Sequence, residues 1–471
     1  MKANISQNSL TNTSILSTLQ LETLAVEELK FPHLMSKKIA DKAVQSLMRA
    51  IARVGHQIVP ILVDDENFIV AGFEVAAALM ELGSSTVAVV KLGNLTKAET
   101  SAIMLLLAKV PERSPWDVEA TSALLHEISI EDPDALEITG FEVGEIDVAL
   151  NGLDGAYNET AAADMVDAEE LSSQFGEGYL PVVQAGDVFV LGPHRVVCGD
   201  SLKAETYTML LDGEVAAAVI ADPPYNIQIA GNVSGLGKAK HSDFAMGVGE
   251  MSFEQFSEFL KSMLLLSVAV LSAGALLFVF MDRRHLEELF KAVRDASLRL
   301  VDVAIWNKLS GGMGGLYRSQ HEPCIVAQVT GGPLINNVQL GKFGRYRTNV
   351  WDFRGYNSFG KGRMEAIKAH PTVKPWQMLA EIILDCTKRG AIVLDPFLGS
   401  GSTILAAETT ARRCFGIELE PKYVEVAIAR WEAMTRAKAL HLKTGLTLEE
   451  LRTERSRAAE SKLIGPSEGD K

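Results

Sequence analysis

From about residue 179 onward, the sequence repeats one pattern, in which short apolar runs alternate with stretches of helical spacing. Apolar runs of this length are typical of strands buried on both faces, and helices between them indicate a mostly parallel sheet. In such sheets, ligands bind beyond the carboxyl ends of the strands. The sequence therefore predicts an α/β domain whose informative motifs directly follow strands. The expected strands are residues 187–191, 195–198, 215–221, 275–280, 303–306, 324–328, 391–394 and 413–417. The expected helices include residues 253–271, 285–296, 376–388 and 404–409.

Changes in composition divide the rest of the chain. A polar tail (1–20) precedes a smaller α+β domain (21–110) and a helical extension (111–152). Residues 153–179 are rich in small and acidic residues without apolar periodicity, which indicates a linker. The large domain spans 180–435, and 436–471 is read as a charged C-terminal tail. In the smaller domain we expect strands at 59–63, 68–70 and 86–91 and a helix at 74–82.

The net charge, the cysteines and the apolar segments limit the functions that the chain can have. The 471 residues carry a formal net charge of −15, so a nucleic-acid partner requires a local basic patch. The four cysteines lie far apart and form no C-x-x-C pair, so we expect reduced thiols and neither zinc nor disulfides. The first twenty residues show no signal-peptide core, and the uncharged stretch 263–280 is interpreted as a helix end, a turn and a strand. A cytoplasmic protein without a membrane span is predicted.

The tetrapeptide Asp222-Pro223-Pro224-Tyr225 follows the buried run 215–221. Asp-Pro alone indicates a proline turn, but the second proline and the tyrosine fit a chemical task. The amino group of a nucleobase is a poor nucleophile because its lone pair is delocalised into the ring. A carboxylate from Asp222 and the carbonyl of Pro223 are placed to accept its two N–H bonds, and the prolines stiffen the loop. Tyr225 offers a ring on which an extruded base stacks.

A glycine-rich loop with an acid at its start follows the run 391–394. The order strand, glycine loop, helix is typical of a nucleotide site. The third glycine of a dinucleotide fingerprint is absent, and so is a Walker lysine. A carboxylate at Asp395 repels pyrophosphate but suits a ligand with an ammonium and a sulfonium. Glu418, nineteen residues beyond Gly399, lies at the offset of an acid that binds ribose hydroxyls.

A proline-bounded segment, His370 to Pro375, precedes the expected helix 376–388. By itself it is a turn. Beside the glycine loop, Thr372 and Lys374 are candidates to hold the carboxylate of the same ligand.

Together these segments resemble the amino-methyltransferases of DNA in which the catalytic tetrapeptide precedes the cofactor loop, the beta order. The resemblance covers about residues 181–435 and includes Gly199-Asp200-Ser201, Trp306-Asn307-Lys308 and Ser319-Gln320-His321-Glu322. It implies a Rossmann-like methyltransferase domain that uses S-adenosylmethionine, with an acid at the Asp200 position beside the cofactor adenine. An aspartate at the head of the tetrapeptide is more typical of adenine-N6 enzymes, and a serine of cytosine-N4 enzymes. The cofactor-binding residues it implies are Asp200, Thr372, Lys374, Asp395, Phe397, Gly399, Gly401, Thr403 and Glu418.

Residues 21–110 resemble the ParB/sulfiredoxin-type domain that is fused to methyltransferases in phages and prophages. The similar segments are 55–60, Phe68-Ile69-Val70-Ala71-Gly72, Ala76-Ala77-Ala78 and Leu82-Gly83. After Gly72 that family usually has His or Glu with a nearby Arg, whereas this chain has Phe73-Glu74-Val75. Without a cation there, nucleotide hydrolysis is not expected, and a docking or DNA-positioning role remains.

A basic and aromatic stretch, residues 331–370, is the predicted DNA contact. A charged surface loop is the plain alternative, but a local basic excess in an acidic chain favours phosphate. A second candidate is the glycine-rich segment 226–250 after the tetrapeptide. The predicted DNA-binding residues are Asn226, Lys342, Arg345, Arg347 and Arg354.

The sequence thus favours methyl transfer to adenine N6 in DNA and leaves two alternatives open: cytosine-N4 methylation, and a catalytically silent DNA-binding module. A small-molecule oxidoreductase is disfavoured by the missing third glycine and by Asp395. The recognition sequence, a homodimer and a restriction partner are left open, because base-edge contacts depend on docking geometry.

Overall fold

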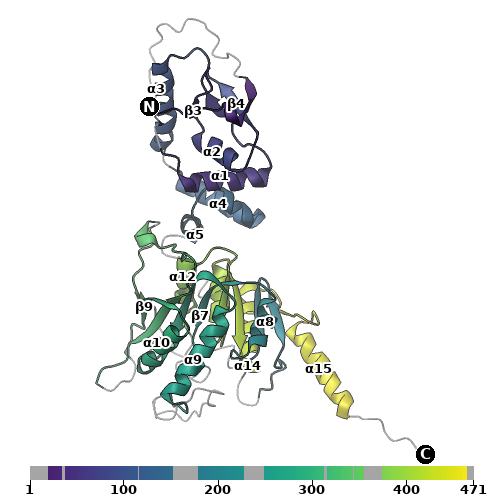
Figure 1. Cartoon of the computed structure of the whole chain (residues 1–471). Helices are drawn as coiled ribbons and strands as arrows, with labels where there is room; N and C mark the ends of the chain where they lie inside the picture. Colours follow the sequence, from purple (N-terminus) through teal and green to yellow (C-terminus); the bar gives the residue numbers. More distant parts are fainter. Residues whose placement is uncertain are drawn as a thin grey trace, which may run out of the picture. The chain divides into compact units, whose positions relative to one another are not determined.

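The computed structural model describes residues 20–33, 35, 38–114, 116–151, 175, 179–227, 249–311, 316–342, 344–354 and 374–463. The chain divides into two compact units, Met1–Leu150 and Asn151–Lys471 (Figure 1). Within the described residues, no helix is both long and apolar enough to cross a membrane. All four cysteines are free thiols and buried.

The first unit contains a four-stranded sheet in the order β1-β4-β2-β3, in which β2 is parallel to β4 and the other pairs are antiparallel. Its core joins this sheet to α1 and α2 through residues such as Ile61, Ile69 and Leu79. The strands are β1 Leu21–Ala25, β2 Ile61–Val63, β3 Ile69–Ala71 and β4 Thr86–Lys91. The helices are α1 Asp41–Val54, α2 Phe73–Glu81, α3 Lys97–Lys109, α4 Val118–Glu131 and α5 Val143–Asn151, with short 3-10 turns at Val26–Glu28, Pro111–Arg113 and Pro133–Ile138.

The second unit is built on a ten-stranded sheet in the order β11-β9-β10-β8-β7-β12-β13-β6-β5-β14. Its centre, from β8 to β6, is parallel, as the apolar runs predict. The strands are β5 Val188–Leu191, β6 His194–Cys198, β7 Ala216–Ala221, β8 Leu271–Phe280, β9 Arg299–Asn307, β10 His321–Gln328, β11 Val350–Asp352, β12 Ile392–Asp395, β13 Arg413–Glu418 and β14 Leu440–His441. The helices are α8 Ala204–Leu211, α9 Phe253–Val268, α10 Leu286–Asp295, α12 Trp376–Cys386, α13 Ser402–Thr409, α14 Pro421–Thr435 and α15 Leu448–Leu463, with 3-10 turns at Arg283–His285 and Gln339–Gly341.

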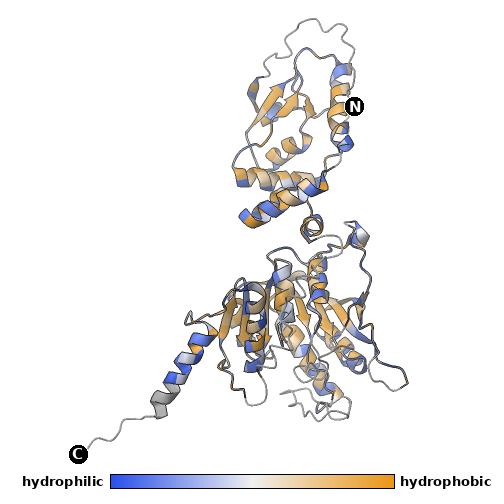
Figure 2. Cartoon of the chain, turned by 180° about the vertical axis from the view of Figure 1, so that it is seen from behind, coloured by the Kyte–Doolittle hydropathy of each residue, from blue (hydrophilic) through white to orange (hydrophobic). Residues whose placement is uncertain are grey.

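Helices cover both faces of this sheet because its central strands are apolar on both sides. In β7, Ala218 and Ile220 join the cluster under α12, α13 and α14, whereas Val219 and Ala221 join the cluster under α8, α9 and α10. Figure 2 shows the resulting band of apolar strands between the helices. The Rossmann-like α/β fold predicted from the sequence is therefore confirmed.

The boundaries differ from the predictions where sequence signals were weak. The stretch 263–280 is the end of α9, a turn and a strand, as predicted, but β8 begins four residues earlier, at Leu271. β10 also begins earlier than predicted, at His321, so it includes the charged Glu322. α9 begins at a capping box in which Ser252 and Gln255 bond each other's backbone N–H.

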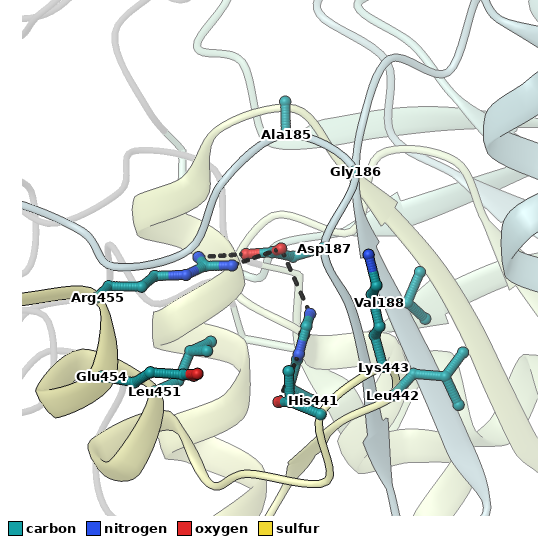
Figure 3. Close-up of a pocket in the computed structure, with 11 residues that line it drawn as sticks. Ala185, Gly186, Asp187, Val188, His441, Leu442, Lys443, Leu451, Glu454 and Arg455 are labelled. Atoms are coloured by element: carbon teal, nitrogen blue, oxygen red, sulfur yellow. Dashed lines mark hydrogen bonds and ion pairs between the residues drawn. The ribbon is translucent and has the colours of Figure 1, made fainter. Parts of the chain in front are cut away.

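Part of the expected C-terminal tail packs on the sheet. β14 extends the sheet beside β5, and α15 follows it. The two guanidinium nitrogens of Arg455 donate to the carboxylate of Asp187 at 2.6 and 2.9 Å, and Nε2 of His441 lies 3.4 Å from it (Figure 3). The hollow beside this ion pair is lined by residues 185–188, 441–444 and part of α15, none of which is a predicted site residue.

Candidate active site

Four acidic residues lie at the carboxyl ends of four neighbouring parallel strands. Asp222 follows β7, Asp395 ends β12, Glu418 ends β13, and Asp200 comes two residues after β6. Since β7, β12, β13 and β6 are consecutive in the sheet, one edge gathers all four. The structure thus brings together the predicted catalytic and cofactor-binding acids.

The glycine loop is tied to the end of β13. The N–H of Gly399 donates to Oε2 of Glu418 at 2.8 Å. At Gly399, where φ is 53°, an added Cβ meets no atom within 4 Å, so open space lies over the loop. Gly401 is required for packing instead: its φ is 84°, and a Cβ there lies 2.8 Å from Cβ of Ala427 on α14. The structure therefore leaves room beside the loop backbone at Gly399.

Asp395 is buried, and each of its carboxyl oxygens accepts one hydrogen bond. Thr403 donates its hydroxyl to Oδ2 at 2.6 Å, and the N–H of Phe397 donates to Oδ1 at 3.0 Å. Burial is the largest influence on this carboxyl and raises its pKa to about 7. Phe397 is half-buried, and its ring centre lies 6.2 Å from that of Phe259 on α9. Thr403, predicted as a ligand residue, holds Asp395 in place in this structure.

Glu418 is the second acid of this half, and it is half-buried. Its Oε1 accepts the N–H of Glu420 at 2.8 Å, in addition to its bond with Gly399. Burial raises its pKa to about 7 as well. Two carboxyls with raised pKa values favour a cationic ligand, because a nearby positive charge stabilises their ionised forms. The carboxyls of Asp395 and Glu418 therefore fit a ligand that carries a positively charged sulfonium and hydroxyl groups.

Asp200 and Arg430 complete the cofactor half. Asp200 caps its own turn by accepting the N–H of Leu202 at 2.9 Å, and its side chain is 24% exposed. The preceding Gly199 donates its N–H to the carbonyl of Glu418 at 2.8 Å, which holds the end of β6 beside β13. Arg430 of α14 donates to the carbonyl of Ser400 at 2.7 Å and so holds the glycine loop against α14. The sequence did not indicate this role for Arg430.

The tetrapeptide lies in a cluster of charged groups. Lys374 donates to Asp222 and to Tyr225 at 3.2 Å, and its Nζ lies 2.9 Å from Oε1 of Glu322. The hydroxyl of Tyr225 lies within hydrogen-bond distance of both Asp222 and Glu322, at 2.7 Å from the latter. Lys308 donates to the other oxygen of Glu322 at 2.7 Å. We call these five residues the acceptor cluster: Asp222, Tyr225, Lys308, Glu322 and Lys374.

Burial and neighbouring charges set the protonation of this cluster. Burial raises the pKa of Asp222, the charge of Glu322 adds to this, and Lys374 opposes it. Burial also disfavours the charge of Glu322, but Lys374 and Lys308 outweigh it and lower its pKa to about 2. Burial opposes the charge of Lys374, yet the two carboxylates raise its pKa. Burial, followed by both carboxylates, raises the pKa of Tyr225, so its hydroxyl remains a donor.

Lys374, in the segment before α12, has other partners in the structure than the sequence predicts. Lys374 was predicted to hold the cofactor carboxylate, but in this structure it is buried between Asp222 and Glu322. Thr372 lies outside the described residues. Pro223 is buried and Pro224 half-buried, which is consistent with a stiff loop around the tetrapeptide.

Two predicted DNA-binding residues have structural roles instead. The side chain of Asn226 is buried, donates to the carbonyl of Met251 at 2.8 Å and accepts the N–H of Gly249 at 3.1 Å. Arg345 is 5% exposed and donates to Glu381 at 2.6 Å and Asp385 at 2.9 Å on α12. The prediction that these two side chains contact DNA is wrong, because their polar atoms face the interior and bond other residues there.

The remaining predicted DNA-binding residues lie nearer the surface. Arg347 is half-buried and donates to Asp385 at 3.0 Å. Lys342 and Arg354 are exposed. Between them, Trp351 of β11 is buried in the core, so part of the predicted basic loop is an edge strand of the sheet.

Sequence reasoning did not select Glu322 or Lys308 as site residues, although both stand in segments that carry the resemblance. A signal was present: Glu322 is a charged residue within the apolar strand β10, where an unpaired charge is costly. Among the described residues, no group of His, Cys, Asp and Glu is arranged to hold a metal ion.

Comparison with known proteins gives this site a family. Residues 216–429 match the family model described as DNA methylase. Over these residues the chain is similar to DNA methylases of the N6/N4 type. The methyl donor of such a methylase is S-adenosylmethionine, the cofactor predicted from the sequence.

The individual relatives of the chain are distant. It is similar to the Type II methyltransferase M.HpaI of Haemophilus parainfluenzae, with 26% identity over 51% of this chain and 74% of that protein. It is also similar to the Type II methyltransferase M2.DpnII of Streptococcus pneumoniae, with 27% identity over 46% of this chain and 82% of that protein. Among solved structures, the PvuII DNA methyltransferase (cytosine-N4-specific) is 17% identical over 60% of this chain and 96% of its own, with a TM-score of 0.40.

Proposed function

We propose that the chain transfers the methyl group of S-adenosylmethionine to the N6 amino group of adenine in DNA. The observation that carries this proposal is the position of Asp222, at the carboxyl end of β7 and beside the strand that ends at Asp395. An acceptor carboxylate and a cofactor acid on adjacent strands bring the two substrates to one edge of the sheet.

Each residue of the cofactor half has a proposed task. S-adenosylmethionine supplies an electrophilic methyl group on a sulfonium sulfur. Asp395 faces the positively charged part of the cofactor, Glu418 accepts from the ribose hydroxyls, and Asp200 lies beside the adenine ring. Gly399 leaves room for close approach, since the space above it is open.

The acceptor half activates the amino group. Asp222 accepts one N–H of the base and the carbonyl of Pro223 accepts the other, so the nitrogen lone pair turns toward the methyl group. Tyr225 offers its ring to a base turned out of the duplex. The aspartate at the head of the tetrapeptide favours adenine N6 over cytosine N4, the alternative that the same geometry serves.

DNA contacts are proposed for exposed cations. Lys342 and Arg354 are exposed, with Arg354 just after β11, and both are proposed to contact phosphates. Arg347 is proposed as a third such cation, with its Nε held by Asp385.

The first unit is proposed to position DNA without hydrolysing a nucleotide. After Gly72, which adopts φ of 93°, both Phe73 and Val75 are buried in the core and supply no cation. A phosphate needs a cation or free N–H groups, so this turn is a poor nucleotide site.

Identification of the product nucleoside tests the proposed function. Unmethylated DNA is incubated with the full chain and S-adenosylmethionine that carries a deuterated methyl group, and then digested to nucleosides. Mass spectrometry is expected to find the label in N6-methyldeoxyadenosine. Label in N4-methyldeoxycytidine would establish the alternative, and unlabelled DNA would contradict both.

A further inference from the structure

The two oxygens of the Asp222 carboxylate are both occupied in the structure. Oδ1 receives the hydroxyl of Tyr225, and Oδ2 receives Nζ of Lys374. A carboxylate with both oxygens occupied has a reduced capacity for a further N–H donor. Under the proposed function, Asp222 must accept an amino N–H of the base. Its remaining lone pairs can accept that bond, but Asp222 is a stronger acceptor once one of the present donors has left.

Glu322 is bonded to the same two partners. Its Oε1 lies 2.7 Å from the hydroxyl of Tyr225 and 2.9 Å from Nζ of Lys374. A tyrosine hydroxyl has one proton, so Tyr225 donates to only one of the two carboxylates at a time. Rotation of the O–H bond from Asp222 to Glu322 therefore removes the donor from Oδ1, and the tyrosine oxygen then moves away because two oxygens with no proton between them repel.

Lys374 does not prevent this exchange, because an ammonium has three protons for its three acceptors. Glu322 retains it through Oε1 while Lys308 holds the other oxygen at 2.7 Å. With two ammonium groups and two carboxylates, the cluster is neutral when all four are charged. A base can enter without leaving a buried charge unpaired.

We propose that Glu322 is a positioning residue of the methylase, which takes the hydrogen bond of Tyr225 and holds Lys374 so that Asp222 is free to bind the target amino group. The inference rests on the proposed function. Glu322 reaches the reacting atoms only through these two partners, and it lies on β10, well separated along the chain from the tetrapeptide.

The variant Glu322→Gln keeps the size of the side chain and removes its charge. The hydroxyl of Tyr225 then prefers the charged Asp222, so Oδ1 remains occupied. We expect kcat to fall by about tenfold to a hundredfold, as for loss of a hydrogen bond to a charged group. KM for S-adenosylmethionine should not change, since Asp395 and Glu418 are untouched. Glu322→Asp, which keeps the charge, should recover part of kcat.

The pH profile separates this role from simple support of the fold. Asp222 acts as an acceptor only when ionised, so activity falls at low pH. The charge of Glu322 helps to raise the pKa of Asp222. Its removal lowers that pKa, and the acid limb of the kcat profile should move to lower pH. The ionisable groups that act on Asp222 are Tyr225, Lys374 and Glu322, with Asp395 and Cys324 nearby and Lys308 behind Glu322.

The full chain is assayed for methyl transfer to unmethylated DNA, with Glu258→Gln as a control that removes an exposed carboxylate on α9. Calorimetric binding of S-adenosylmethionine verifies that each variant is folded. If Glu322→Gln does not fold, Tyr225→Phe gives the second test: it removes the competing hydroxyl, so Glu322→Asp should then cost less than it does in the wild type.

Three results would overturn the inference. In an active wild type, an unchanged kcat for Glu322→Gln would show that the exchange is not needed. A lower kcat with an unmoved acid limb would show a structural role only. A wild type that binds S-adenosylmethionine but leaves DNA unmethylated would remove the proposed function itself, and this inference with it.

Discussion

The cofactor half and the acceptor half of the site are held together in different ways. Gly399 and Glu418 are 19 residues apart and joined by a backbone N–H, and Thr403 is 8 residues from Asp395. Lys374 is 152 residues from Asp222, and Glu322 is 97 from Tyr225, and both contacts are between side chains. The cofactor half is thus preformed by local backbone geometry, whereas the acceptor half consists of charged groups that satisfy each other until substrate enters.

The largest effect is expected at Asp222. Asp222→Ala removes an acceptor that acts mainly in the transition state, so kcat should fall by about a thousandfold. The affinity for S-adenosylmethionine should change little, because Asp222 is not bonded to the glycine loop. Steady-state methyl transfer and calorimetry on the same sample measure the two quantities. Near-normal turnover would remove Asp222 from its role.

The converse effect is expected at Glu418. Glu418→Ala removes the proposed ribose acceptor and releases the N–H of Gly399. We expect affinity for S-adenosylmethionine to fall by about tenfold to a hundredfold. The neighbouring Glu420→Ala is the matched control, since Glu420 bonds Glu418 through its backbone N–H, which the substitution keeps. Equal affinities in the two variants would place the cofactor elsewhere.

Gly399→Val, which fills the open space over the loop, should weaken binding in the same way.

The pH dependence of cofactor binding should come from the cofactor half. Burial raises the pKa of Asp395 from 3.8, and that of Glu418 from 4.5, to about 7 in each case. The folded protein holds more protons on them than the unfolded chain does, so their contribution to the free energy of unfolding declines as pH rises from about 4 to about 7.

A cationic cofactor favours the ionised carboxyls, so its binding should release protons below about pH 7 and weaken by about tenfold per carboxyl for each pH unit below that. Calorimetry at pH 6 in two buffers of different ionisation enthalpy measures the release. The release should be smaller in Asp395→Asn. Binding without proton release would contradict the assignment of these acids.

The smallest effect is expected from removing the first unit. Tyr179 and the N–H of Val183 bond Glu425 of α14, so a fragment has to start before Tyr179. A fragment of residues 170–471 should fold, bind S-adenosylmethionine and methylate DNA, with DNA affinity reduced a few-fold by loss of a tethered contact. Methyl transfer at several salt concentrations compares it with the full chain. A folded fragment that binds cofactor but transfers no methyl group at low salt would make the first unit part of the active assembly. Residues 1–152 alone should show no appreciable nucleotide hydrolysis.

The same contrast explains what the sequence predicted. Asp395, Gly399 and Glu418 were found because an acid, a glycine loop and a strand end follow one another within a short distance along the chain. The parallel centre of the sheet followed from apolar runs such as β7.

Such patterns could not predict contacts between side chains that lie far apart in the sequence. Arg345 was counted as a cation available to DNA, but packing turns it onto Glu381 and Asp385. Asn226 was assigned to DNA, although its amide holds Gly249 and Met251. Lys374 was assigned to the cofactor, and only the fold shows that it reaches Asp222. The charge of a residue shows which kind of partner is favourable, but the fold decides which partner lies within reach.

The central claim, that the two halves of the site act separately, is tested most directly by single-turnover methyl transfer to DNA at saturating S-adenosylmethionine. Glu418→Ala should regain a rate close to that of the wild type, because the excess cofactor overcomes its weaker binding. Asp222→Ala should remain about a thousandfold slower, because its loss lies in the transferring step. Recovery of Asp222→Ala under the same conditions would contradict the account.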